Sequence, residues 1–131
     1  MSSRRAVLGL VVGASQILSA AAHSLLGWPG LKQELAAAGV PSDLERGVEI
    51  GWHFGGVAML AFGLVVIGVF ARRLRGQAVS TLPAALIACA YLGFGAWALW
   101  RSDFEPFFLV FVVPGALLAI AASGSAERQA S

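Results

Sequence analysis

Two histidines and one carboxylate stand inside apolar stretches of this chain, and they are the side chains best suited to chemistry. Glu49 and His53 are four residues apart, so they lie on one face of a helix, and His23 belongs to an earlier apolar stretch. Since a helix rises about 1.5 Å per residue, the two histidines reach a similar depth when their helices are antiparallel neighbours. We therefore expect His23, Glu49 and His53 to converge near one end of a helix bundle.

Three kinds of site are compatible with this convergence. Two imidazoles and a carboxylate could bind a first-row metal ion, and two imidazoles on facing helices could ligate a haem. A carboxylate beside an imidazole could instead transfer protons, or hold a quinone or another lipophilic ligand. No H-x-x-x-H or C-x-x-C-H motif is present to favour the metal or the haem. A structural role for all three side chains is the alternative to a site.

Polar side chains extend the expected pocket toward the middle of the apolar stretches. Gln16, Ser19 and His23 follow one another at helical spacing, and their polar groups would be unsatisfied in lipid, so their face should point into the bundle. Tyr91 lies in the middle of another apolar stretch. It needs a hydrogen-bond partner there, for which Gln16 or Ser15 is available.

The rim of the expected pocket carries aromatic and basic residues. Trp52 could add an aromatic wall, and Arg46 and Arg101 could neutralise an acidic ligand group. Anchoring at the membrane surface is the alternative role for Trp52, since tryptophan is enriched where a membrane meets water.

Glycines at every fourth position mark a second face of the stretch that contains Glu49 and His53. Gly47, Gly51 and Gly55 form a G-x-x-x-G series, roughly opposite the Glu49–His53 face because two residues correspond to about 200° of rotation. Such a face permits close helix contact. We expect it to pack against another helix of the chain. The alternative is the seam of a homo-oligomer or the contact with a membrane partner subunit.

Composition indicates the environment of these stretches. Of the 131 residues, 58% are hydrophobic and 12% are charged, whereas a soluble domain typically has about 25% charged residues. The charges gather in short clusters between long uncharged stretches, as in proteins that cross a bilayer several times. We therefore predict an all-α integral membrane protein in contact with the lipid bilayer, and nothing in the sequence indicates nucleic-acid binding. Cys89 is the only cysteine, so no disulfide can form within the chain.

The whole chain, residues 1–131, is predicted to form one transmembrane domain, an antiparallel bundle of four membrane-spanning helices. Their expected bounds are about 6–27, 46–71, 81–100 and 106–122. Trp28-Pro29-Gly30 should end the first helix, and residues 31–38 should form a short interfacial helix between the first two spans. Within the first span, Gly9 and Gly13 form a further G-x-x-x-G pair that permits close approach of a second helix.

The basic residues predict the orientation in the membrane. One side collects six arginines, and the other carries Lys32, Arg46 and Arg101. Because cytoplasmic loops hold the excess of lysine and arginine, both termini should be cytoplasmic. The six arginines are Arg4, Arg5, Arg72, Arg73, Arg75 and Arg128. A signal peptide cleaved after Ala22 is the alternative, and it would leave three spans and an exterior N-terminus.

These residues and elements predict a small protein of the bacterial inner membrane with a polar pocket near the outer leaflet. The pocket would hold a lipophilic small molecule or a cofactor, with haem, a quinone and a first-row metal as candidates, and could take part in proton or electron transfer. The alternative is a non-catalytic accessory subunit that associates through its glycine-rich helix faces. Neither interpretation identifies a reaction.

Overall fold

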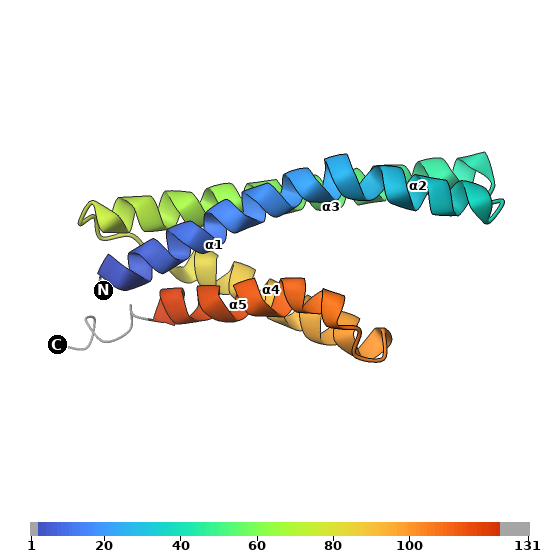
Figure 1. Cartoon of the computed structure of the whole chain (residues 1–131). Coiled ribbons are helices and arrows are strands. Elements are labelled where there is room, and N and C mark those ends of the chain that lie inside the picture. The colour runs from blue at the N-terminus through green and yellow to red at the C-terminus, as the bar shows by residue number, and fades with distance from the viewer. Residues whose placement is uncertain (1–2, 124–131) are drawn as a thin grey trace.

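Helices form all the regular structure that is described. The computed structural model of the chain describes residues 3–123, which contain helices and no strand (Figure 1). Three helical stretches are long and apolar enough to cross a membrane, and a fourth apolar helix is shorter. They are Ser3–Ala37, Ser42–Leu74, Leu82–Arg101 and the shorter Pro106–Ala122. The prediction of an all-α protein with four apolar helical stretches is confirmed, and their length and composition are those of a multi-pass membrane protein.

The first helical stretch does not end at Trp28-Pro29-Gly30, and that prediction is wrong. Helix α1 (Ser3–Ala22) passes into a π turn, η1 (His23–Gly27), which continues as α2 (Trp28–Ala37) with right-handed helical angles at both junctions. Pro29 occupies the first turn of α2, where proline is tolerated, and only Trp28 separates it from the π turn, which already interrupts the regular ladder of hydrogen bonds. A change of helix type therefore accommodates the proline and keeps the stretch continuous.

The separate interfacial helix predicted for residues 31–38 is not found. Most of these residues belong to α2, which prolongs α1 and runs beside the first half of α3 (Ser42–Leu74) (Figure 1). The Nζ atom of Lys32 lies 3.5 Å from Oε1 of Glu45 and links the two helices. The turn between them contains Gly39 in the left-handed region, at φ 67°. The chain from α1 to α3 thus forms one long antiparallel hairpin.

Helix α3 is longer than a bilayer requires. Its 33 residues correspond to about 50 Å, against about 30 Å for a hydrocarbon core. The expected span of residues 46–71 lies inside it. At its start the backbone N–H of Glu45 donates to the carbonyl of Pro41 at 2.9 Å, and no side chain caps the helix. The first half of α3 runs beside α2, and the length in excess of a bilayer lies mainly there (Figure 1).

A shorter hairpin completes the described chain. It consists of α4 (Leu82–Arg101), a 3-10 turn η2 (Pro106–Phe108) and α5 (Leu109–Ala122), within one residue of the bounds expected for the third and fourth spans. The connection reverses direction through two residues with left-handed backbone, Asp103 (φ 53°) and Phe104 (φ 63°). This hairpin ends well short of the turn between α2 and α3 (Figure 1).

Close backbone contact at glycines holds α1 against α3. A Cβ on Gly63 would lie 2.8 Å from the carbonyl oxygen of Gly13, and a Cβ on Gly13 would lie 3.1 Å from the carbonyl oxygen of Gly63. Gly9 packs in the same way against the ring of Phe70. Any larger residue at this crossing would push the helices apart. The prediction that Gly9 and Gly13 permit close helix approach is confirmed.

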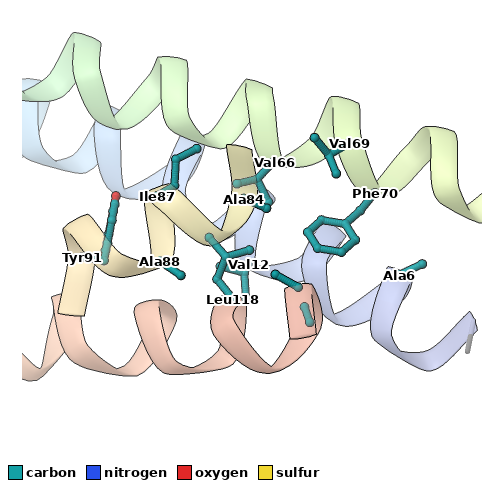
Figure 2. Close-up of a cluster of buried hydrophobic side chains, with 12 residues drawn as sticks. Ala6, Val12, Val66, Val69, Phe70, Ala84, Ile87, Ala88, Tyr91 and Leu118 are labelled. Atoms are coloured by element: carbon teal, nitrogen blue, oxygen red, sulfur yellow. The ribbon is translucent and has the colours of Figure 1, made fainter. Parts of the chain in front are cut away.

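The buried apolar side chains gather toward one end of the molecule. We call this end, where α1 begins and α5 finishes, the arginine end, and the opposite end, with the two hairpin turns, the loop end (Figure 1). The described arginines of the arginine end are Arg4, Arg5, Arg72, Arg73 and Arg75, and Arg128 lies outside the described residues. Val12 of α1, Val66 of α3, Ala84 of α4 and Leu118 of α5 are buried side chains there (Figure 2). From this core the two hairpins diverge toward the loop end (Figure 1).

Candidate functional site

His23 and Trp52 hold each other in a reciprocal contact, which we call the His23–Trp52 clasp. The Nε2 atom of His23 donates to the backbone carbonyl of Trp52 at 3.0 Å, and the indole Nε1 of Trp52 donates to the backbone carbonyl of His23 at 2.8 Å. The rings are stacked, with centroids 4.2 Å apart and an interplanar angle of 8°. Because both side chains are only partly buried, this clasp links η1 to α3 without a fully desolvated core.

His53 faces a different partner. Its ring centroid lies 5.8 Å from that of Trp28, at an interplanar angle of 57°, and Trp28 is buried. Neighbouring residues of a helix point about 100° apart. The rotation of α3 that presents Trp52 to His23 therefore turns His53 toward the start of α2.

The expected metal-binding convergence of His23, Glu49 and His53 is not formed. Among residues 3–123, no group of three or more histidine, cysteine, aspartate or glutamate side chains is placed to hold a metal ion. Nε2 of His23 is engaged by a backbone carbonyl, which leaves one ring nitrogen for any other bond. Glu49 is partly buried on α3. The four-residue spacing on α3 shows that Glu49 and His53 share one face of that helix. It contains no information on how α1 is rotated toward that face.

A second set of predicted residues, Gln16 and Tyr91, is deeply buried. Gln16 is 2% exposed and Tyr91 is 7% exposed. Neither Nε2 nor Oε1 of Gln16, nor the hydroxyl of Tyr91, has a hydrogen-bond partner in the described part of the chain. The predicted hydrogen bond from Tyr91 to Gln16 or Ser15 is thus not made, and Ser15 Oγ donates instead to the carbonyl of Val12 at 2.7 Å.

Contacts across the bundle place Gln16 and Tyr91 at one level. Gln16 lies one turn beyond Gly13, which touches Gly63 on α3. The ring of Phe62, next to Gly63, has its centroid 6.3 Å from that of Tyr91 on α4. Tyr91 in turn packs on α5, where a Cβ on Gly115 would lie 3.0 Å from the Cβ of Tyr91. Helices α1, α3, α4 and α5 therefore all contribute residues near the level of the two unpartnered side chains.

An open groove of about 500 Å³ runs between α1 and α5 beside Gln16. Ligand pockets typically measure about 300–1,000 Å³. Val12, Ser15 and Ser19, which flank Gln16 on its helix, line one side. The other lining residues are Val11, Leu109, Val110, Val113, Pro114 and Leu117. Pro114 has no N–H to donate to the carbonyl of Val110 one turn earlier, so this wall lacks one hydrogen bond of the regular helical ladder.

The groove was only partly foreseeable. Of the residues that line the groove, only Ser19 was among the expected pocket residues, and the contribution of α5 was not expected. Two features of the sequence point to it, namely Pro114 inside an apolar helix and the hydroxyls of Ser15 and Ser19 four residues apart. The proline and the two serines each leave polar groups on a helix face, and lipid cannot form hydrogen bonds with such groups.

The remaining predicted site residues lie away from this groove. Trp52 is engaged in the clasp, and Arg46 and Arg101 are exposed on α3 and α4, which do not line the groove. A Cβ on Gly47 or Gly51 would meet no atom within 4 Å.

Of Gly47, Gly51 and Gly55, only Gly55 approaches another described helix, since its Cβ would lie 3.3 Å from His23 Nε2. Packing within the chain is therefore the wrong interpretation for Gly47 and Gly51. The faces that do pack contain Gly56 and Gly63, because the rotation of α3 is set where the glycines of both helices meet.

Comparison of the chain with protein-family models, with curated proteins and with solved structures finds no match. The class that the fold defines is that of helical multi-pass membrane proteins, on the length and composition of three helices and a shorter fourth.

Proposed function

We propose that this chain is a small protein of the bacterial inner membrane that binds a lipophilic small molecule within the bilayer. The site is the groove between α1 and α5, which has Ser19 in its lining. Gln16 and Tyr91 are not part of the lining and are buried at the same level of the bundle. This location is deeper than the pocket expected near the outer leaflet. The observation that carries the proposal is the amide of Gln16, which is 2% exposed and without a hydrogen-bond partner among residues 3–123.

Energetics support a ligand at this position. A buried polar group that lacks a partner costs about 1–3 kcal/mol, and the penalty is removed when a partner is supplied. In the hydrocarbon region water does not provide that partner, so a ligand that enters from the bilayer is the natural source. The size of the groove and its position on the lipid-facing side of α1 and α5 are consistent with such an entry.

The clasp residues then have a supporting role. His23 and Trp52 fix η1 to α3 about two helical turns from Gln16, through two hydrogen bonds and a stacked contact. They hold the α1–α3 hairpin in the rotation that directs Gln16 into the bundle.

The test is the identity of what accompanies the purified protein. Wild type, Gln16→Leu and Gln33→Leu are released from membranes in mild detergent, and bound compounds are extracted and identified by mass spectrometry. Gln33 is exposed on α2 and is the matched control. A defined lipophilic compound retained by wild type and Gln33→Leu and lost from Gln16→Leu is the expected result. Equal retention by all three proteins, or bulk phospholipid alone, contradicts the proposal.

A second candidate function is association with a membrane partner, either a second copy or an accessory contact to another subunit. The observation that favours it is the exposed pair Gly47 and Gly51 on α3, where a side chain would meet nothing within 4 Å. Small residues of this spacing allow another helix to approach closely. Gly51→Leu should then abolish assembly while leaving the folded monomer intact, as read by crosslinking in the membrane.

A further inference from the structure

We infer that the ligand of the α1–α5 groove is an uncharged ring compound that carries carbonyl or hydroxyl oxygens, with a lipid-soluble quinone as the simplest example. The inference rests on the proposed function and adds the chemical class of the ligand. Three independent features support it, and they are the charge of the surroundings, the hydrogen-bonding capacity of the two buried side chains and the rings around them.

The surroundings of Gln16 and Tyr91 are without formal charge. The sequence contains no Asp, Glu, Lys, Arg or His in residues 6–22, 54–71, 82–100 or 106–122. These ranges cover every helix segment at the level of the two side chains. A charged ligand group would therefore be buried without a counter-charge, which is costly in a membrane interior. This excludes fatty acids, phospholipid headgroups and organic cations as good ligands.

The two side chains supply both donors and acceptors. The amide of Gln16 carries an NH₂ donor and a carbonyl acceptor, and the hydroxyl of Tyr91 can donate or accept. All of these groups lack partners among residues 3–123. They can donate to ligand carbonyls and can equally accept from ligand hydroxyls. A pure hydrocarbon would leave them unsatisfied, so the ligand must carry oxygen functions of its own.

Aromatic side chains also lie at the level of Gln16 and Tyr91 in the bundle. Tyr91 lies between Phe62 and Phe111, with ring centroids 6.3 Å and 6.1 Å away. Phe111 also meets Phe94 edge-to-face at 4.9 Å. These rings do not line the groove, but a flat ring that reached Tyr91 from the groove would meet them. The groove lined by Val11, Val110 and Val113, which are all exposed on the outside of the bundle, is suited to an aliphatic tail.

The test compares probes that differ in one property. The full chain is placed in phosphatidylcholine nanodiscs with decylubiquinone, with decylbenzene, which lacks oxygens, or with palmitate, which is charged. Retention is measured in excess of protein-free nanodiscs, and the carbonyl stretching band of the quinone is recorded by infrared spectroscopy. Wild type is compared with Gln16→Leu, Tyr91→Phe, Ser19→Phe, which fills the groove, and the control Gln33→Leu.

The expected result is selective retention of the quinone. Its retention should exceed that of decylbenzene at least tenfold, and should fall about tenfold in Gln16→Leu and in Tyr91→Phe. Tenfold corresponds to about 1.4 kcal/mol, the scale of one hydrogen bond. Wild type should shift the carbonyl band to lower frequency, and Gln16→Leu should lose part of that shift. Gln33→Leu should behave as wild type.

The other outcomes separate the two proposals. If decylbenzene or palmitate is retained as well as the quinone, and Ser19→Phe abolishes this retention, the groove binds ligands but the assigned ligand class is wrong. If no probe is retained beyond protein-free nanodiscs and Ser19→Phe makes no difference, both the ligand class and the proposed function are overturned.

Discussion

Gln16 and Tyr91 bury three polar atoms without a hydrogen-bond partner in the described chain. Most buried polar groups in proteins are paired, and each unpaired one costs about 1–3 kcal/mol. A leucine at position 16 would have nearly the same volume and no such cost. Replacing Gln16 by leucine should therefore stabilise the ligand-free protein and weaken its binding of a ligand.

Gln16→Leu is expected to raise the free energy of unfolding of the ligand-free protein by about 1–2 kcal/mol, because it removes an unsatisfied amide from a buried position. Chemical denaturation in detergent micelles measures the change. Gln33→Leu, at an exposed position, should change it by less than about 0.5 kcal/mol. A loss of stability in Gln16→Leu would mean that the amide has a structural partner.

The His23–Trp52 clasp makes a different prediction. Both hydrogen bonds end on backbone carbonyls, so His23→Phe and Trp52→Phe each remove one donor while a stacked aromatic pair remains. Each should cost about 1 kcal/mol, and the double variant should be additive within about 0.5 kcal/mol. The alanine variants share the lost stacking contact and should be non-additive by about 0.5–1.5 kcal/mol. Unfolding measured on both double-mutant cycles checks this, and additive alanine variants would contradict the stacked geometry.

At the scale of elements, the crossing of α1 and α3 sets the rotation of both helices. Gly63→Val is expected to lower the free energy of unfolding by about 1–3 kcal/mol, since its side chain would meet the backbone of Gly13. Gly51→Val is the matched control on the same helix, where a side chain meets nothing within 4 Å. It should leave the monomer nearly unchanged. Equal destabilisation by both variants would contradict the described packing.

The helices could be predicted from the sequence because uncharged apolar stretches have clear ends. The bounds of α4 and of the helical segment 106–122 differ from expectation by a residue at most. The continuity of α1 and α2 could not be predicted, because a proline followed by a glycine is typical of a helix end, and the π turn that accommodates Pro29 has no sequence signature.

The site was predictable only in part for a related reason. Spacing along one helix shows which residues share a face, and so Glu49 was correctly related to His53. It does not show which face meets a neighbour. Gly47, Gly51 and Gly55 have the regular spacing, yet Gly56 and Gly63 make the tight contacts with the first stretch. Trp52 for this reason meets His23, while His53 meets Trp28.

At the scale of the whole molecule, the two hairpins differ in length. α3 has 33 residues and α4 has 20, a difference of about 20 Å at about 1.5 Å per residue. A bilayer that fits α4 and α5 therefore leaves the turn between α2 and α3 in water. In the proposed orientation, with both termini in the cytoplasm, this turn would face the periplasm.

Cysteine labelling tests this placement. In a Cys89→Ala background, Ser42→Cys at the exposed start of α3 should react in intact cells with a maleimide that does not cross the inner membrane. Arg75→Cys, at the opposite end of the same helix, is the control and should react only after the membrane is opened. The reverse pattern would invert the orientation.

The shorter helix α5 needs its own test, since Pro106–Ala122 is less than the length of a typical span. Reporter fusions after Ser102 and at the C-terminus should fall on opposite sides of the membrane, with alkaline phosphatase active only at the first. Equal activity of both fusions would mean that α5 does not cross.

The arginines of the arginine end also have an electrical consequence. A bacterial inner membrane is negative inside, and moving one elementary charge across it changes the energy by about 2.3 kcal/mol per 100 mV. The described arginines of this end flank long uncharged stretches, and no acidic residue of the described chain lies beside them. In a molecule inserted the other way round, all of these arginines would lie on the positive side of the membrane. At the proposed location in a bacterial inner membrane, the membrane potential would thus favour the orientation with cytoplasmic termini, and this preference would weaken when the cell is de-energised.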